Sequence, residues 1–281
     1  MSEAFGSRLR AVFSSSGRLC VGIDPHAALL SAWGLPDSAS GVRDFGLRVV
    51  EAVADRAGIV KPQIAFYERH GSAGYSALED VLASARAAGL LVIADVKRGD
   101  LGTSVDAYGE AWLTPGSPLE ADAMTAVAFQ GLGSLDGVLD LAQRAGKGVF
   151  VLAATSNPEG FVTQSALRSD GLSVAAGVVA EVAARNAASG SDVLGSVGVV
   201  VGATVARADF GIADTSLAGM PVLAPGFGHQ GARMSQLPEL FGSAAQNVLV
   251  SASRSILSAG PAGIEAAIDD AAAEVVAACR G

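Results

Sequence analysis

The chain is poor in cysteine, and the two that it has are far apart. Cys20 and Cys279 lie near opposite ends of the 281 residues, and neither belongs to a CxxC pair or to a metal-ligand spacing. This pattern indicates neither a disulfide framework nor a cysteine-based metal site. It predicts a protein of a reducing, cytoplasmic compartment.

Long apolar runs and an excess of basic charge are also missing. No segment reaches the roughly 18 uninterrupted apolar residues of a transmembrane helix, so we expect no membrane span. The first 19 residues have no compact apolar segment and no small-residue cleavage site. Their serines and arginines faintly resemble a transit peptide, but an N-terminal helix and turn is the favoured interpretation. A net charge of −9 argues against nucleic acid as a partner, although a local basic pocket stays open.

What the chain does have is a regular alternation of two kinds of segment. Short apolar, β-branched runs alternate with longer alanine-rich stretches of helical spacing, several of which end in glycine. Eight runs that are apolar on both faces predict a parallel sheet covered by helices. We expect a single (β/α)8 TIM barrel spanning 1–281, and an open doubly wound sheet is the alternative. The predicted strands are 19–24, 58–63, 90–97, 123–128, 148–154, 198–204, 221–226 and 247–253.

Charged and polar residues gather where the predicted strands end, although only 17% of the chain is charged. In a barrel of this kind the carboxyl ends of the strands form the functional face. Each residue alone has a structural explanation as a turn former, a strand end or a salt bridge, but their common position favours a site. These residues are Asp24, Lys61, Asp95, Lys97, Asp100, Ser156 and Arg254.

The stretch VIADVKRGDLGTS places four charges within six positions after a buried strand. Residues two apart share a face of an extended strand, so Asp95 and Lys97 are expected to project together. An ammonium beside carboxylates keeps its charged form. Lys97 is therefore a candidate proton donor rather than a Schiff-base nucleophile.

A phosphate site is expected at the last two strands. The loop PGFGHQG has three glycines that allow a close backbone approach, and Gln230 adds an amide donor. Arg254 follows the eighth strand and offers a planar pair of donors to phosphate oxygens. Loops in these two places often bind phosphate in barrels of this kind.

Taken in order, these motifs resemble one enzyme family. DVKRGD is similar to the Asp-x-Lys-x-x-Asp signature of the orotidine 5′-phosphate decarboxylases, in the form typical of their longer bacterial branch. VGIDPH, KPQIAFYERHG, TSNPEG, PGFGHQGA and SRSIL extend the resemblance from residue 21 to residue 257. The resemblance implies decarboxylation of orotidine 5′-phosphate to UMP and CO2, the last step of de novo UMP synthesis, without a cofactor or metal.

The resemblance also implies roles for individual residues. Lys97 would donate the proton to C6, Asp95 would lie beside the departing carboxylate, and Lys61 would bridge the ribose and the charge cluster. Asp100 would reach the partner's site in a homodimer, with Ser104 or Thr103 beside it. Substrate binding would fall to Asp24 at the ribose, Ser156 at the base, and Gln230 and Arg254 at the phosphate.

Two departures from the family pattern lie in the phosphate region. Ser253 stands where glycine is common, and HQGA replaces a more usual Ala-Gln-Gly-Gly. Either could change phosphate affinity or loop closure. Of the histidines, His26 is interpreted as a turn residue and His229 as a lining of the phosphate loop, while His70 has no assigned role.

Two other functions remain open. A metal-dependent sugar-phosphate decarboxylase or aldolase would use Mg²⁺ and an acidic residue after the second strand, where this chain has Lys61, with Glu68 downstream. A catalytically silent protein that binds a nucleotide phosphate is the other. Activity that persists with a chelator present would argue against the metal-dependent enzyme. Turnover of orotidine 5′-phosphate would argue against the silent binding protein.

Overall fold

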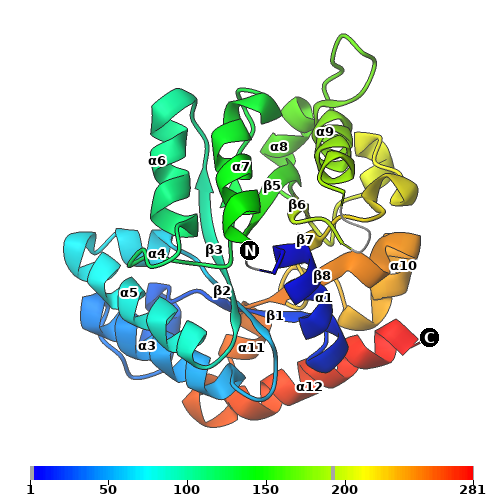
Figure 1. Cartoon of the computed structure of the whole chain (residues 1–281). Coiled ribbons are helices and arrows are strands. Elements are labelled where there is room, and N and C mark those ends of the chain that lie inside the picture. The colour runs from blue at the N-terminus through cyan, green and yellow to red at the C-terminus, as the bar shows by residue number, and fades with distance from the viewer. Residues whose placement is uncertain (1–2, 191–193, 281) are drawn as a thin grey trace.

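The computed structural model describes residues 3–190 and 194–280, and in it eight parallel strands close into a barrel (Figure 1). The strands pair in chain order, and β1 closes the sheet by pairing with β8. The predicted TIM barrel is thus confirmed, and the open sheet is excluded. The strands are β1 Leu19–Ile23, β2 Ile59–Pro62, β3 Leu91–Arg98, β4 Ala123–Ala126, β5 Gly148–Ala154, β6 Val197–Val201, β7 Val222–Pro225 and β8 Val248–Ala252.

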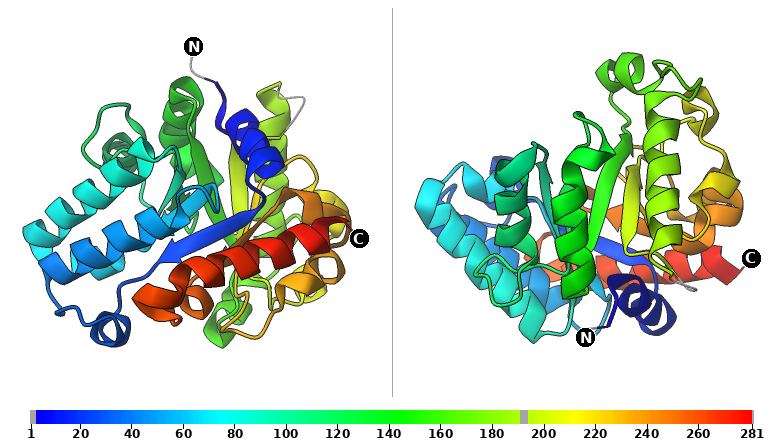
Figure 2. Two further views of the ribbon diagram at one scale, coloured as in Figure 1. Left: turned by 90° about the horizontal axis from the view of Figure 1, so that it is seen from below. Right: turned by 45° about the horizontal axis from the view of Figure 1, so that its top comes forward.

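Helices cover the outside of the barrel, as the alternation of segments predicts. Figure 2 shows α12 lying along the barrel beside β1 and α3. The α-helices are α1 Phe5–Ser15, α2 Ala27–Ala32, α3 Ala39–Val53, α4 Ala65–Glu68, α5 Gly71–Ala87, α6 Gly102–Leu113, α7 Asp136–Ala145, α8 Pro158–Gln164, α9 Val174–Ala188, α10 Leu237–Phe241, α11 Arg254–Leu257 and α12 Gly260–Arg280. Short 3-10 turns are η1 Leu132–Leu135, η2 Arg207–Phe210, η3 Asp214–Leu217, η4 Met234–Gln236 and η5 Gly242–Asn247.

Two apolar cores follow from the alternation of side chains along each strand. The larger core joins the outer face of the strands to the surrounding helices, with Val21, Val60 and Val92 among its members. The smaller core fills the barrel, with Cys20, Ile59, Leu91, Ile93, Phe150, Leu223 and Leu249 among its members.

Helix α1 closes the amino-terminal end of the barrel. Its apolar stripe of Phe5, Leu9 and Phe13 is buried and belongs to the core inside the barrel. Phe5 meets Phe150 of β5 edge to face, with 6.0 Å between the ring centroids. The predicted N-terminal helix is therefore present, and it fills the end opposite the functional face.

Of the helices in the described part of the chain, none is both long and apolar enough to cross a bilayer. Both cysteines are free thiols, Cys20 inside the barrel and Cys279 on the surface. Burial raises the pKa of the Cys20 thiol to about 12, against weaker opposing contributions from Lys61 and Ser251.

Candidate active site

A single carboxylate organises the charged groups at the carboxyl end of β2, β3 and β4. Asp95 Oδ2 accepts hydrogen bonds from Lys61 Nζ and Gln63 Nε2, both at 3.0 Å. Its other oxygen accepts from Lys97 Nζ at 2.6 Å and from Thr125 Oγ1 at 2.9 Å. Both oxygens of Asp95 are thus held by two donors each.

The strand pattern explains why two of these charges are buried. Residues two apart share a face of a strand. Lys61 therefore follows Ile59, and Asp95 follows Leu91 and Ile93, on the face that points into the barrel. Lys61 and Asp95 are 6% and 7% exposed. A solvated strand end, the structural explanation considered for Lys61, is therefore wrong.

Mutual attraction keeps this buried pair charged. Burial opposes ionisation of Asp95, but Lys61 and Lys97 outweigh it, and the pKa of the Asp95 carboxyl lies below its ordinary value. Burial likewise disfavours the charged form of Lys61, but Asp95 and Asp24 overcome this and raise the pKa of its ammonium. A lysine in this state is a fixed positive charge and a poor nucleophile.

Lys97 reaches Asp95 from an irregular part of β3. Between Ala94 and Arg98 the register with β4 shifts, because these residues pair with Met124 and Ala126. Within this bulge Lys97 has a left-handed backbone, with φ +48°. The prediction that Asp95 and Lys97 lie together is confirmed, but a regular pleat is not the reason for it.

A second group of predicted residues surrounds a smaller cavity beside the cluster. This cavity of about 170 Å³ is lined by Asp24, Arg254, Gln230, His26, His229, Phe66, Phe227 and Ser253. Ser253 Oγ donates to Asp24 Oδ2 at 2.6 Å, so the serine that replaces a glycine of the family pattern holds the expected ribose ligand. The other oxygen of Asp24 is buried and has no hydrogen-bond partner among the described residues.

The expected base-binding and phosphate-binding residues approach one another over this cavity. Ser156 Oγ donates to Gln230 Oε1 at 3.5 Å, which links the loop after β5 to the loop after β7. Gly228 has φ +79°, and a Cβ there would lie 2.3 Å from Ser255 Oγ on α11. Glycine therefore lets the loop after β7 pass close to the helix that begins with Arg254.

Two of the histidines have defined structural positions. His26 caps α2, and its Nδ1 accepts the Leu29 N–H at 3.4 Å, which agrees with its interpretation as a turn residue. Burial and the nearby Arg254 lower the pKa of the His26 imidazole, against the attraction of Asp24. His70 Nε2 lies 3.7 Å from Asp37 on the outside of the barrel.

Asp100 and Ser104 are not brought into the cluster within one chain. Asp100 accepts the N–H of Leu101 at 2.9 Å, and Ser104 and Thr103 are exposed in the first turn of α6. Among the described residues, no ion pair or hydrogen bond joins any of these side chains to Asp95 or Lys97.

The acidic residue that a metal-dependent enzyme would need after β2 is engaged elsewhere. Glu68 forms an ion pair with Arg98 and accepts a hydrogen bond from Tyr75 at 2.7 Å. Within residues 3–190 and 194–280, no three His, Cys, Asp or Glu side chains converge as a group able to hold a metal ion. The single carboxylate of the cluster is already bonded to two lysines.

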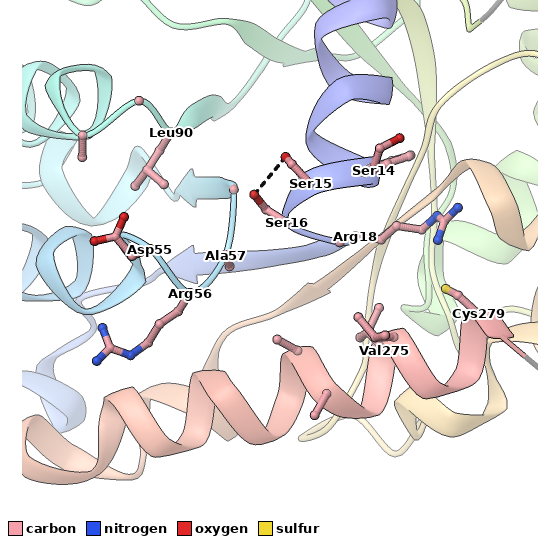
Figure 3. A pocket seen from close by; sticks show the side chains of 18 residues that line it. Ser14, Ser15, Ser16, Arg18, Asp55, Arg56, Ala57, Leu90, Val275 and Cys279 are labelled. Carbon is pink, nitrogen blue, oxygen red and sulfur yellow. Dashed lines mark hydrogen bonds between the residues drawn. The ribbon is translucent and has the colours of Figure 1, made fainter.

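A cleft larger than the small cavity beside the cluster lies at the other end of the barrel. About 850 Å³ in volume, it is bordered by the end of α1, the turn before β2 and α12, as Figure 3 shows. Its charged lining residues, Arg18, Asp55 and Arg56, are partly or fully exposed. Volume alone does not identify the site here, whereas the position of Lys61, Lys97 and Asp95 at the carboxyl ends of the strands does.

Sequence reasoning did not identify Gln63, Thr125 or the Ser253 contact as parts of the site. Gln63 lies two residues after Lys61, and Thr125 is the one polar residue of Ala123–Ala126. Those two positions are weak signals, because a lone polar residue at a strand end has many structural uses.

A closed parallel barrel with a buried lysine–carboxylate cluster at its carboxyl-terminal mouth defines an α/β-barrel enzyme of the TIM class. The model of the orotidine 5′-phosphate decarboxylase / HUMPS family matches residues 17–267. The chain belongs to this family, as the sequence motifs predicted.

Individual relatives agree over nearly the whole chain. An orotidine 5′-phosphate decarboxylase of Streptomyces coelicolor is 51% identical over 259 residues, which cover 92% of this chain and 91% of the relative. One from Salinispora tropica is 48% identical, with 99% of this chain and 98% of the relative covered.

Solved structures agree as well. The crystal structure of a Streptomyces avermitilis protein assigned as an orotidine 5′-phosphate decarboxylase superposes with a TM-score of 0.94 at 47% identity, covering 100% of this chain and 97% of that one. Leishmania donovani OMP decarboxylase superposes with a TM-score of 0.78 at 28% identity, covering 99% and 100%.

Proposed function

We propose that this chain decarboxylates orotidine 5′-phosphate to UMP with Lys97 as the proton donor to C6. The reaction follows from membership of the family and from relatives about half identical over almost the whole chain. The residue roles are our proposal, and one observation carries them: Lys61 and Lys97 share the single carboxylate of Asp95 at the barrel mouth.

The chemistry requires a positive charge where a negative charge develops. When the bond between C6 and the carboxylate breaks, its electron pair stays at C6 as CO2 leaves. The Lys97 ammonium, fixed by Asp95, would stabilise this charge and then transfer its proton to C6, which completes UMP. The neutral amine would regain a proton from water. A charge held in place before the reaction needs no reorganisation during it.

Asp95 would lie beside the departing carboxylate, and Lys61 would balance its charge. Four donors hold the carboxylate of Asp95, so it cannot turn away from a second negative group. Repulsion would be relieved as CO2 leaves, while the attraction to Lys97 would grow. Enzymes lower barriers by about 8 to 23 kcal/mol, so we assign the reaction to the cluster together with the phosphate site.

Arg254 and Gln230 would hold the phosphate, Asp24 the ribose, and Ser156 the base. These residues come from the loops after β1, β5, β7 and β8, and all except Ser156 line the small cavity. Binding energy at the phosphate would draw the loops over the base and exclude water from the cluster.

A homodimer would complete the site. Asp100 would contribute to the site of the partner chain, with Ser104 or Thr103 beside it. Leu101, next to Asp100, is 61% exposed, and Phe129, after β4, is 83% exposed. Apolar side chains left in water next to a functional loop favour an interface there. We further propose that 1–281 acts as one domain in the cytoplasm, for which the two free thiols are suited.

The test mixes purified protein with orotidine 5′-phosphate in the presence of EDTA and follows the ultraviolet absorbance of the substrate. We expect conversion to UMP at full rate. Binding of UMP without any conversion would support the silent binding protein instead. Activity that appears only when Mg²⁺ is restored would favour the metal-dependent alternative.

A further inference from the structure

The hydroxyl of Thr125 connects the two residues on which the proposed reaction depends. Its Oγ1 accepts the backbone N–H of Lys97 at 2.9 Å and donates to Asp95 Oδ1 at 2.9 Å. The side chain of Lys97 donates to the same oxygen at 2.6 Å. Lys97, Thr125 and Asp95 therefore form a closed ring of hydrogen bonds.

The directions of these hydrogen bonds are fixed by chemistry. A backbone N–H can only donate and an ionised carboxylate can only accept, so the hydroxyl proton must point at Asp95 and a lone pair at Lys97. Thr125 is 1% exposed, so water cannot replace either bond without entering the barrel. A valine of the same shape would provide neither bond.

The Lys97 backbone needs such a partner because it has left the regular ladder. A left-handed backbone costs an ordinary residue roughly 1–2 kcal/mol, and Lys97 has φ +48° within the bulge of β3. The hydroxyl of β4 takes the Lys97 N–H in place of a strand carbonyl. It thereby holds the bulge in the shape that directs the ammonium toward Asp95.

We infer that Thr125 is a positioning residue of the decarboxylation, which sets the Lys97 ammonium and the Asp95 carboxylate in their reactive orientation through one hydroxyl. The inference rests on the proposed role of Lys97. Thr125 acts through its two neighbours, and its removal should change turnover more than binding.

The experiment uses two pairs of full-length proteins that differ only by the hydroxyl. The first pair is wild type and Thr125→Val, whose side chains have the same shape. The second pair is Thr125→Ser and Thr125→Ala, whose side chains are smaller. Wild type and the Ser variant keep the hydroxyl. We would measure kcat and KM for orotidine 5′-phosphate, UMP affinity by calorimetry, and thermal unfolding of all four. Wild-type turnover is the control for the proposed reaction itself, because its absence would contradict that reaction and not the role of Thr125.

We expect removal of the hydroxyl to lower kcat about 10- to 100-fold in each pair, by analogy with residues that orient metal-ligating side chains. KM and UMP affinity should change less than about threefold, since neither hydrogen bond reaches the phosphate site. Thr125→Ser should keep kcat close to that of wild type. If Thr125→Val does not fold, the Ser and Ala pair supplies the same comparison.

A kcat ratio below about threefold in a folded pair would overturn the inference. So would an equal loss of kcat in the Ser and Ala variants, because that would indicate packing rather than hydrogen bonding. A change confined to KM would also contradict it.

Discussion

Lys61 and Lys147 are buried to the same degree at opposite ends of one barrel, but their surroundings differ. Both side chains are 8% exposed. Lys147 precedes β5 at the closed end, where it and Arg8 of α1 form ion pairs with Glu120 and Asp122. Lys61 at the open end shares one carboxylate with Lys97.

The difference separates a structural cluster from the one that we propose to be reactive. At the closed end Lys147 and Arg8 are paired with Glu120 and Asp122 between elements that close the barrel. At the open end the side chain of Lys97 is bonded to Asp95 and is still 44% exposed, so a substrate can reach its ammonium. Access to a charged group therefore distinguishes the two clusters where burial does not.

The comparison is tested most strongly by Lys97→Ala. We expect kcat to fall about 10³-fold or more, because both a general acid and a stabilising charge are lost. UMP affinity, measured by calorimetry, should stay within a few-fold of wild type. A variant with near-normal turnover would contradict the proton-donor role.

Lys147→Met should give the opposite result. Removing one partner of a buried ion pair costs about 3–5 kcal/mol, so the free energy of unfolding in urea should fall by about this amount. The kcat of the folded variant should remain that of wild type. Loss of turnover without loss of stability would show that the two ends of the barrel are not independent.

Arg254→Ala should affect binding and turnover together. Loss of a charge-assisted contact to phosphate should lower kcat/KM about 100-fold, through both kcat and KM, because phosphate binding closes the loops. The measurement is steady-state kinetics, with Arg8→Ala at the closed end as control. Equal effects of the two arginine variants on KM would contradict a phosphate site at Arg254.

Acid should weaken the closed end through Glu120. Burial raises the pKa of the Glu120 carboxyl, but the hydrogen bonds from Lys147 and the Gly116 N–H lower it more, and it lies below the ordinary 4.5. Such a carboxyl stabilises the fold above its unfolded pKa, and this stability is lost as the pH falls through the lower folded pKa. Glu120→Gln should be less stable than wild type at pH 7. As the pH falls below 4.5, the variant should lose less stability than wild type does. Urea unfolding at several pH values measures both differences.

The smallest effect is expected at Tyr67, outside both clusters. Its side chain is fully buried, and its hydroxyl has no hydrogen-bond partner among the described residues. Tyr67→Phe should increase the free energy of unfolding by about 1 kcal/mol, because an unsatisfied polar group is removed. Tyr75→Phe, which loses a bond to Glu68, should decrease it. A destabilised Tyr67→Phe would indicate a partner for that hydroxyl.

The barrel and the open end could be predicted from the sequence for a physical reason. Strands buried on both faces are apolar throughout, so charges such as Lys61 and Asp95 mark the end where the pattern breaks. The resemblance to a known family added roles to these positions, and family membership was confirmed.

The partners of those charges could not be predicted in the same way. Thr125 of β4 bonds to Asp95, and Ser253 after β8 bonds to Asp24. The two members of each pair are far apart in the sequence. Such contacts depend on the register between strands and on the bulge at Lys97, which no local pattern reports. The cluster around Lys147 was missed as well, because its members are spread from α1 to the start of β5.

The position of α1 also limits the routes by which small molecules can reach and leave the site. Phe5, Leu9 and Phe13 occupy the amino-terminal end of the barrel, so within the described residues apolar side chains close the barrel axis at that end. With the site where we propose it, nucleotide, solvent and gas would all enter and leave through the mouth at the carboxyl ends of the strands. Newly formed CO2 would then have to leave past the nucleotide, by the route through which the next substrate enters.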